Sequence, residues 1–226
     1  QAAAVAALEA AARLAPAAAD VLFGLGNAYR RAGRPGDAVD AFARCLAVDP
    51  AHVPALNNQG GALADQGDVD RAVDEFRRAA AARPDDPRVL SQVLYRMHFS
   101  PRFDAPAIYH EHRRWHARFE APLAAGRRPH DAPRDPGRRL RVGYVSPDFR
   151  EWRDVGRLTD AELADAIRRD RVDVLVDLTL HMADNRLPAF ARKPAPVQVT
   201  YLGYCGTTGL DAVDVRLTDP HLAPPG

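Results

Sequence analysis

The apolar positions in the first part of the chain recur with a period of about 34 residues. Within one period, apolar residues are spaced three and four apart, which predicts pairs of amphipathic helices. The residue types also recur: small, aromatic and proline positions of one period return in the next. The matching sets are Leu22, Gly26, Ala38, Phe42 and Pro50, then Leu56, Gly60, Ala72, Phe76 and Pro84.

Two glycines and two prolines determine how the helices of this repeat pack and where they end. Gly26 and Gly60 would allow two helices to approach closely, and Pro50 and Pro84 would end each second helix. This pattern is typical of the tetratricopeptide repeat, which we expect over residues 1–86. Such repeats stack into an α-solenoid with a concave surface that binds peptides or proteins. A purely structural spacer is the alternative.

Residues 87–123 continue as helix without the repeat pattern, and we interpret them as a helical transition. One apolar stripe there contains Ile108, His112, Trp115 and Phe119. His112 and His116 have the i, i+4 spacing of a metal-binding pair, but no third ligand accompanies them. We therefore expect packing and surface histidines, and no metal site. Residues 124–139 are rich in Pro, Gly and Arg and predict a linker.

The pattern changes again after residue 139. Four short Val- and Leu-rich runs follow, and their near-continuous apolar character predicts strands buried on both faces of a parallel sheet. A helix between the first two begins with Thr159 and Glu162 in the spacing of a capping box. The sequence therefore predicts a second, Rossmann-like α/β part over residues 140–226. The four expected strands are 140–146, 172–178, 197–204 and 212–219.

Charge and cysteine content narrow the class of protein. The chain has 31 basic and 30 acidic residues, so no global positive field favours nucleic acid or an anionic membrane. Its two cysteines, Cys45 and Cys205, are far apart, which argues against a disulfide scaffold and favours a reducing cytoplasm. No apolar run of about 18 residues is present. The chain begins at Gln1, and we expect it to be a fragment.

Three segments follow the predicted strands, at the edge where ligands bind to such sheets. They are residues 146–149, 179–185 and 203–209. The last spaces its glycines as GxxGxxG and adds two hydroxyls, Thr207 and Thr208. This composition suits contacts with sugar or phosphate, but an ordinary glycine-rich turn is an equal alternative.

Tandem repeats followed by LRVGYVSPDF and KPAPVQVTYLGYCGTTG resemble the O-linked N-acetylglucosamine transferases. The similarity is greatest to their SPINDLY-type branch. It implies a GT-B glycosyltransferase, in which two Rossmann-like lobes hold a nucleotide-sugar, UDP-GlcNAc or GDP-fucose. The family inverts the sugar configuration, needs no metal or cofactor, and glycosylates Ser and Thr of proteins. The repeats would present the acceptor protein, and a homodimer through the repeats is a further expected option.

The resemblance also implies candidate site residues. Asp148 matches an aspartate that follows the first strand, and His98 lies near a histidine proposed as the base. We therefore expect Asp148 and His98 to be catalytic. The expected substrate-binding residues are His181, Asn185, Tyr204, Gly206, Thr207 and Thr208.

The chain departs from the family after Arg150. The family has a histidine shortly after this point, whereas here EWRDVG follows, which relatives carry later in their sequence. We therefore expect one βα unit to be absent, and the second lobe is not included in the chain. The isolated chain is expected to be inactive. The alternative is a tetratricopeptide binding module with a degenerate, non-catalytic α/β remnant.

Overall fold

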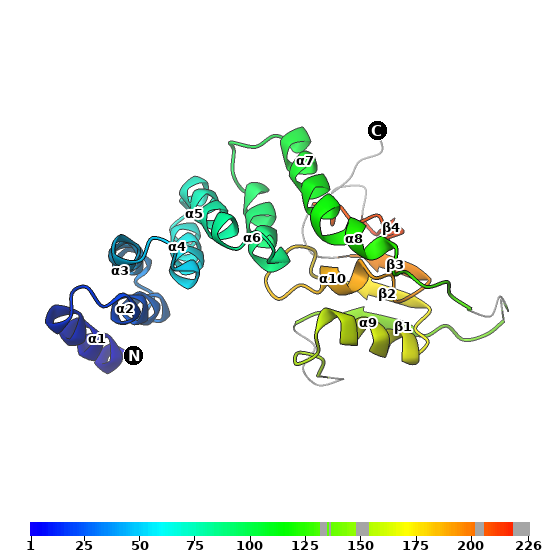
Figure 1. Ribbon diagram of the computed structural model, residues 1–226, viewed down its shortest axis with the longest axis horizontal. Coiled ribbons are helices and arrows are strands. Elements are labelled where there is room, and N and C mark those ends of the chain that lie inside the picture. Colours follow the sequence, from blue (N-terminus) through cyan, green and yellow to red (C-terminus); the bar gives the residue numbers. More distant parts are fainter. Residues whose placement is uncertain (132–134, 136, 148–153, 202–205, 219–226) are drawn as a thin grey trace. The chain divides into compact units, whose positions relative to one another are not determined.

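The computed structural model describes residues 1–131, 135, 137–147, 154–201 and 206–218. The chain forms two compact units, Gln1–Phe103 and Asp104–Gly226 (Figure 1). The division expected from the sequence was finer, with repeats over 1–86, a helical transition over 87–123, a linker over 124–139 and a catalytic lobe over 140–226. Those boundaries remain a prediction.

The first unit consists of helices arranged as successive antiparallel neighbours (Figure 1). The helix pairs α2 with α3 and α4 with α5 make the most extensive contacts, as expected for two helices of one repeat. The α-solenoid predicted from the periodicity is therefore confirmed. Its helices are α1 (Ala2–Leu14), α2 (Ala19–Arg31), α3 (Pro35–Val48), α4 (Val53–Asp65), α5 (Val69–Ala82) and α6 (Pro87–Met97).

The repeat glycines sit against aromatic rings. A Cβ atom at Gly26 would lie 2.4 Å from the Phe42 ring, and one at Gly60 would lie 3.0 Å from the Phe76 ring. Both distances are shorter than a normal van der Waals contact, and Phe42 is completely buried. The prediction that these glycines allow close helix approach is confirmed.

The second unit starts with a helix that changes its winding. α7 (Ala105–Trp115) continues into η1 (His116–Glu120), a π-helical turn, and then into α8 (Ala121–Ala124). Periodicity predicted an amphipathic helix here but not the π-helical turn, a form that often occurs at functional positions. The turn leaves Trp115 and Glu120 fully buried.

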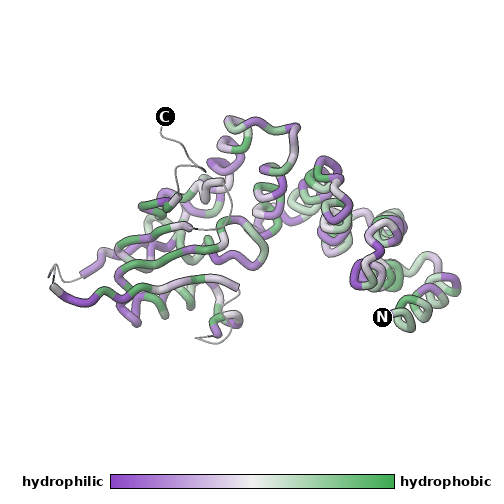
Figure 2. The backbone as a smooth tube through the Cα atoms, turned by 180° about the vertical axis from the view of Figure 1, so that it is seen from behind, coloured by the Kyte–Doolittle hydropathy of each residue, from purple (hydrophilic) through white to green (hydrophobic). Residues whose placement is uncertain are grey.

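Four parallel strands follow, in the order β1-β2-β3-β4. The Rossmann-like sheet is thus confirmed, and α9 and α10 pack against each other beside it (Figure 1). Apolar stretches run along the sheet strands in Figure 2, whereas the helices alternate in polarity. The elements are β1 (Val142–Val145), α9 (Asp160–Arg169), β2 (Val174–Asp177), α10 (Leu187–Phe190), β3 (Val197–Thr200) and β4 (Val215–Arg216).

Burial along the strands partly differs from the prediction. β2 and β3 are largely buried, but β1 is an edge strand whose Val142 and Tyr144 are about half exposed. The expectation of burial on both faces is therefore wrong for β1 and for β4, both of whose residues are exposed. The capping box of α9 is confirmed, because Thr159 N–H donates to Glu162 and Glu162 N–H donates back to the Thr159 hydroxyl, at 2.8 and 3.2 Å.

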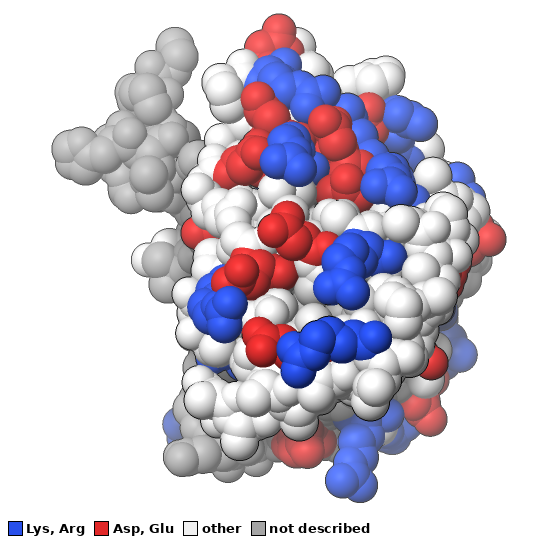
Figure 3. All heavy atoms as spheres, turned by 90° about the vertical axis from the view of Figure 1, so that its left-hand side faces the viewer, with Lys and Arg blue, Asp and Glu red and all other residues white. Residues whose placement is uncertain are grey.

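No helix among the described residues is long and apolar enough to span a membrane. On the face drawn in Figure 3, basic and acidic side chains are interspersed among uncharged ones. This mixture agrees with the nearly neutral net charge of +1.

Candidate functional site

A buried carboxylate shapes the turn at the end of β2. Asp177 accepts hydrogen bonds from the N–H groups of Thr179 and Leu180, at 3.1 and 3.0 Å, and from the Thr200 hydroxyl at 2.9 Å. Burial raises the pKa of the Asp177 carboxyl group above its usual range. The turn holds Leu180 at a φ of +48°, in the left-handed region, and the chain then directs His181 into the interior.

His181 joins three segments that are distant in sequence. Its Nε2 atom lies 2.9 Å from the Thr208 carbonyl oxygen, in the loop after β3. The centre of its ring lies 4.8 Å from the centre of the His112 ring and 5.1 Å from the centre of the Trp115 ring, and both of these residues are on α7. Because a carbonyl oxygen can only accept a hydrogen bond, Nε2 of His181 carries a proton in this arrangement.

The glycine-rich loop packs directly on α7. Gly209 has a φ of +68°, and a Cβ atom there would lie 2.8 Å from the carbonyl oxygen of His112. The Thr207 hydroxyl accepts from Gly209 N–H, and the Thr208 hydroxyl accepts from Leu210 N–H, at 3.1 and 3.2 Å. Glycine is therefore required at position 209 by both backbone conformation and space.

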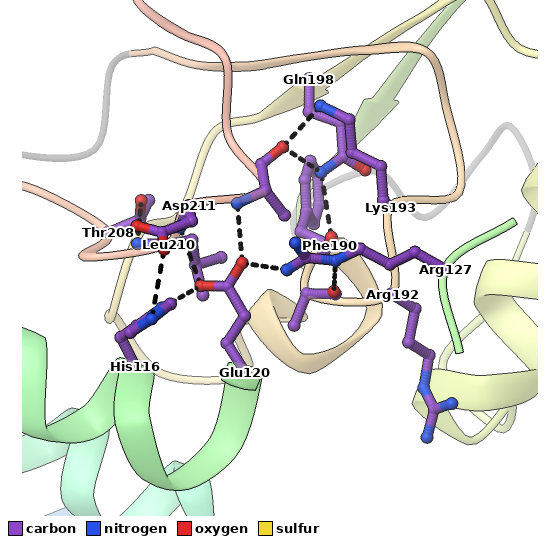
Figure 4. Close-up of polar contacts among 12 residues, drawn as sticks. His116, Glu120, Arg127, Phe190, Arg192, Lys193, Gln198, Thr208, Leu210 and Asp211 are labelled. Atoms are coloured by element: carbon purple, nitrogen blue, oxygen red, sulfur yellow. Dashed lines mark hydrogen bonds and ion pairs between the residues drawn. The ribbon is translucent and has the colours of Figure 1, made fainter. Parts of the chain in front are cut away.

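Glu120 anchors the other end of this loop (Figure 4). Its fully buried carboxylate accepts hydrogen bonds from the N–H groups of Asp211 and Ala212, at 2.8 and 2.7 Å. Arg127 forms an ion pair with the same carboxylate, and His116 Nδ1 lies 2.6 Å from it. The π-helical turn that ends at Glu120 thus connects the helical transition to the loop after β3.

Comparisons with known proteins agree with this architecture. Residues 2–45 and 25–87 match the tetratricopeptide repeat family, and residues 153–225 match glycosyl transferase family 41. A mutant O-GlcNAc transferase of Thermobaculum terrenum superimposes with a TM-score of 0.84 and 34% identity, over 98% of this chain and 51% of that chain. The chain belongs to the O-GlcNAc transferase family.

Several curated relatives of the chain are plant proteins. The probable UDP-N-acetylglucosamine–peptide N-acetylglucosaminyltransferase SPINDLY of Oryza sativa subsp. japonica is 32% identical, over 83% of this chain and 22% of that protein. The protein of the same name from Arabidopsis thaliana is 47% identical over 74 residues. The chain spans about a fifth of the length of the first curated relatives that it matches.

The structure places part of the site expected for an O-GlcNAc transferase in one cluster. His181 and Thr208 are in contact, and Gly206 and Thr207 lie on the same loop as Thr208. Asn185 is buried in its own turn, where it donates to the Met182 carbonyl and accepts from Leu187 N–H, at 2.9 and 3.3 Å. Its amide therefore orders the start of α10.

The remaining expected residues are His98, Asp148 and Tyr204. His98 is the residue that follows α6 in the first unit, and its role stays a prediction. Asp148 and Tyr204 lie outside the described residues. Their roles also stay predictions.

The sequence analysis does not predict Glu120 as a site residue. His112 is fully buried against His181, as expected of a packing histidine. Its signal was a titratable ring on an otherwise apolar stripe, which predicts burial beside another polar group. Among the described residues, no group of three or more His, Cys, Asp or Glu side chains could hold a metal ion.

Proposed function

We propose that this chain belongs to a protein O-glycosyltransferase that transfers N-acetylglucosamine or fucose from a nucleotide-sugar to Ser and Thr of acceptor proteins. Its repeats would bind the acceptor, and its sheet would form part of the donor-facing lobe. The proposal rests on one combination: tetratricopeptide repeats precede a parallel sheet of family 41, with a polar cluster beyond its strands. No metal or other cofactor is part of the proposed mechanism.

The roles that we propose follow the chemistry of the side chains. Transfer requires a proton to leave the acceptor hydroxyl, and it requires the sugar to be held in line with that hydroxyl. We assign proton transfer to Asp148 and His98, and sugar contacts to the turn after β2 and the loop after β3. The sugar-contacting residues are His181, Asn185, Tyr204, Gly206, Thr207 and Thr208.

The buried partners of His181 support the assignment to sugar contacts. Thr208 fixes one ring nitrogen, and His112 with Trp115 fixes the ring plane. A ring held in this way is preorganised, so it loses little freedom when it binds a sugar hydroxyl. We also propose a reducing, cytoplasmic location and, as an open option, a homodimer through the repeats.

A transfer assay tests the proposal. The protein encoded by the whole reading frame that contains this chain should incorporate sugar from UDP-GlcNAc or GDP-fucose into Ser- and Thr-containing peptides. His181→Gln should lower the rate by about tenfold or more, because a hydrogen bond to the donor would be lost. His110→Gln is the matched control, since His110 is exposed on α7. The 226 residues alone should not support transfer.

A non-catalytic binding module is the second candidate. It is favoured by the departure from the family after Arg150, where the expected histidine is replaced by EWRDVG. Peptide binding without transfer from either donor would support this alternative and contradict the enzyme proposal.

A further inference from the structure

An open cavity of about 360 Å³ lies between the first helices of two successive repeats. It is lined by Asn27, Arg30 and Arg31 from α2 and by Asn58 from α4. Each of these four side chains can donate hydrogen bonds, and none is acidic. The cavity lies entirely within the first unit.

The two asparagines orient each other. The Asn58 amide donates to the Asn27 carbonyl oxygen at 2.6 Å. This bond leaves the NH₂ group of Asn27 and the carbonyl oxygen of Asn58 without a partner among the described residues. The cavity therefore offers a fixed pair of N–H donors and, beside them, one fixed acceptor.

The two arginines supply positive charge, which is unpaired at Arg31 among the described residues and weakly paired at Arg30. Arg31 is exposed and has no ion pair or hydrogen bond in the part of the chain that the structure describes. Arg30 Nε lies 3.7 Å from Asp65, in a pair whose side chains are 41% and 55% exposed. An exposed pair at this distance contributes little, so Arg30 can exchange Asp65 for another anion.

Gly61 of α4 lies beside Arg30. A Cβ atom at Gly61 would make an ordinary contact of 3.4 Å with Arg30 Nη1, so only a side chain bulkier than alanine, such as valine, would press on the guanidinium group. The lining combines planar guanidinium groups with amide N–H donors. This combination matches a carboxylate, which accepts up to about four hydrogen bonds and pairs well with guanidinium.

We propose that this cavity binds an acidic side chain, Asp or Glu, of a polypeptide that lies along the repeats. Arg31 and Arg30 would contact the carboxylate together with the Asn27 amide, and Asn58 would accept a peptide N–H of the same segment. Use of the cavity to select acidic acceptors rests on the proposed function. Carboxylate binding does not, and its test involves no sugar transfer.

Another explanation must be separated from this proposal. Arg30 and Arg31 occupy the last turn of α2, where positive charge stabilises a helix through its dipole. That role predicts a loss of thermal stability on neutralising Arg31 but no dependence of peptide binding on acidic residues. The proposal predicts that binding changes more than stability does.

Fluorescence anisotropy with the full chain tests the site. The probe is a labelled peptide of alternating Ser and Glu, and its matched control has Gln in place of every Glu. We expect the acidic peptide to bind about tenfold or more tightly than the control, and the difference to shrink as salt is added. Equal affinity for both peptides would overturn the proposal.

Two variants that each lose one positive charge test whether the acidic peptide binds at this cavity. Arg31→Gln should weaken binding of the acidic peptide by about tenfold. Arg44→Gln, on the exposed surface of α3, should leave binding within about twofold. Gly61→Val should also weaken binding, although it removes no charge. Circular dichroism melts confirm that each variant is folded, and equal losses for Arg31→Gln and Arg44→Gln would exclude this cavity as the site.

Discussion

The two units bury different kinds of residue. Among the described residues, the first unit buries almost only apolar side chains, and its buried polar groups are Gln59, Ser91 and Ser100. The second unit is smaller in its apolar core but buries more polar side chains, charged and titratable ones among them. These are His112, Glu120, Asp173, Asp177, Thr179, His181, Asn185, Gln198, Thr200 and Thr208.

This difference reflects how each unit fixes its geometry. Helices of the repeats are positioned by close contact, as Gly26 against Phe42 illustrates, and such contacts need no polar partners. The loops after the strands lack close helix contacts of this kind. Carboxylates hold the backbone N–H groups of these loops instead. A buried polar network is costly unless every member is satisfied, but it fixes a loop uniquely. The second unit is therefore the place where a mutation of one polar atom should matter most.

Glu120→Gln should have the largest effect. The substitution keeps the shape, but it removes the charge that faces Arg127 and places NH₂ where either Asp211 or Ala212 needs an acceptor. Breaking a buried pair in this way costs about 3–5 kcal/mol. Hydrogen exchange should show lost protection in the second unit, with the first unit unchanged.

Glu111→Gln on the same helix is the control for this variant. Among the described residues, Glu111 pairs only with Arg114, one turn away on the same helix, so its loss should cost less than about 1 kcal/mol. A small effect of Glu120→Gln, or an effect spread equally over both units, would contradict the proposed contrast.

In the first unit, Gly26→Ala should lower the free energy of unfolding. The new methyl group would meet the Phe42 ring at 2.4 Å, and overpacking of this kind costs about 1–3 kcal/mol. Gly24→Ala, two residues earlier on α2, has only an ordinary 3.5 Å contact with Leu8 and should stabilise the helix by about 0.5–1 kcal/mol. Urea unfolding measures both, and equal signs for the two variants would refute the packing argument.

The same contrast explains what could be predicted from the sequence. The first unit repeats, so each position of one period predicts its counterpart, and Gly60 with Phe76 follows from Gly26 with Phe42. The strands were predictable as apolar runs, although the edge position of β1 depends on pairing that a run does not encode.

The polar site was only partly predictable. His181 and Thr208 were found through the resemblance to a family, and they do meet. Glu120 was not found, because its partner Asp211 is 91 residues away and the intervening chain must fold before the contact exists. The π-helical turn that carries Glu120 inward has no periodicity signal of its own, since it changes the winding over only 5 residues.

Acid should destabilise the second unit through Asp173. Arg138 donates two hydrogen bonds to this carboxylate and Arg141 N–H donates another, which lowers its pKa to about 2. The unfolded carboxyl group has a pKa of about 3.9. The stabilisation is therefore fully present above about pH 4 and is lost as the pH falls toward about 2.

Thermal melts across this pH range measure the effect. Asp173→Asn should flatten the dependence of the melting temperature on pH, and Arg138→Gln should reduce it as well, because it removes the main cause of the low pKa. An unchanged slope in both variants would show that other carboxylates account for acid unfolding.

The smallest expected effect comes from a difference in backbone conformation between the turns of the two units. In the first unit, the described residues with a positive φ are glycines, Gly33 and Gly67, whereas the second unit places Arg171, Leu180, Asp184 and Lys193 there. Arg171 follows the end of α9 at a φ of +51°, is exposed and makes no side-chain hydrogen bond or ion pair among the described residues. A side chain in this region costs about 1 kcal/mol, so Arg171→Gly should stabilise the second unit by about 0.5–1 kcal/mol.

Arg169→Gly separates this gain from any general effect of losing an arginine. Arg169 is exposed within the last turn of α9, where glycine is about 1 kcal/mol less favourable than a good helix former. Denaturant unfolding should therefore give opposite signs for the same substitution two residues apart. If both variants were destabilised, the left-handed conformation at Arg171 would carry no strain. The repeats and the sheet would then not differ in how they build their turns.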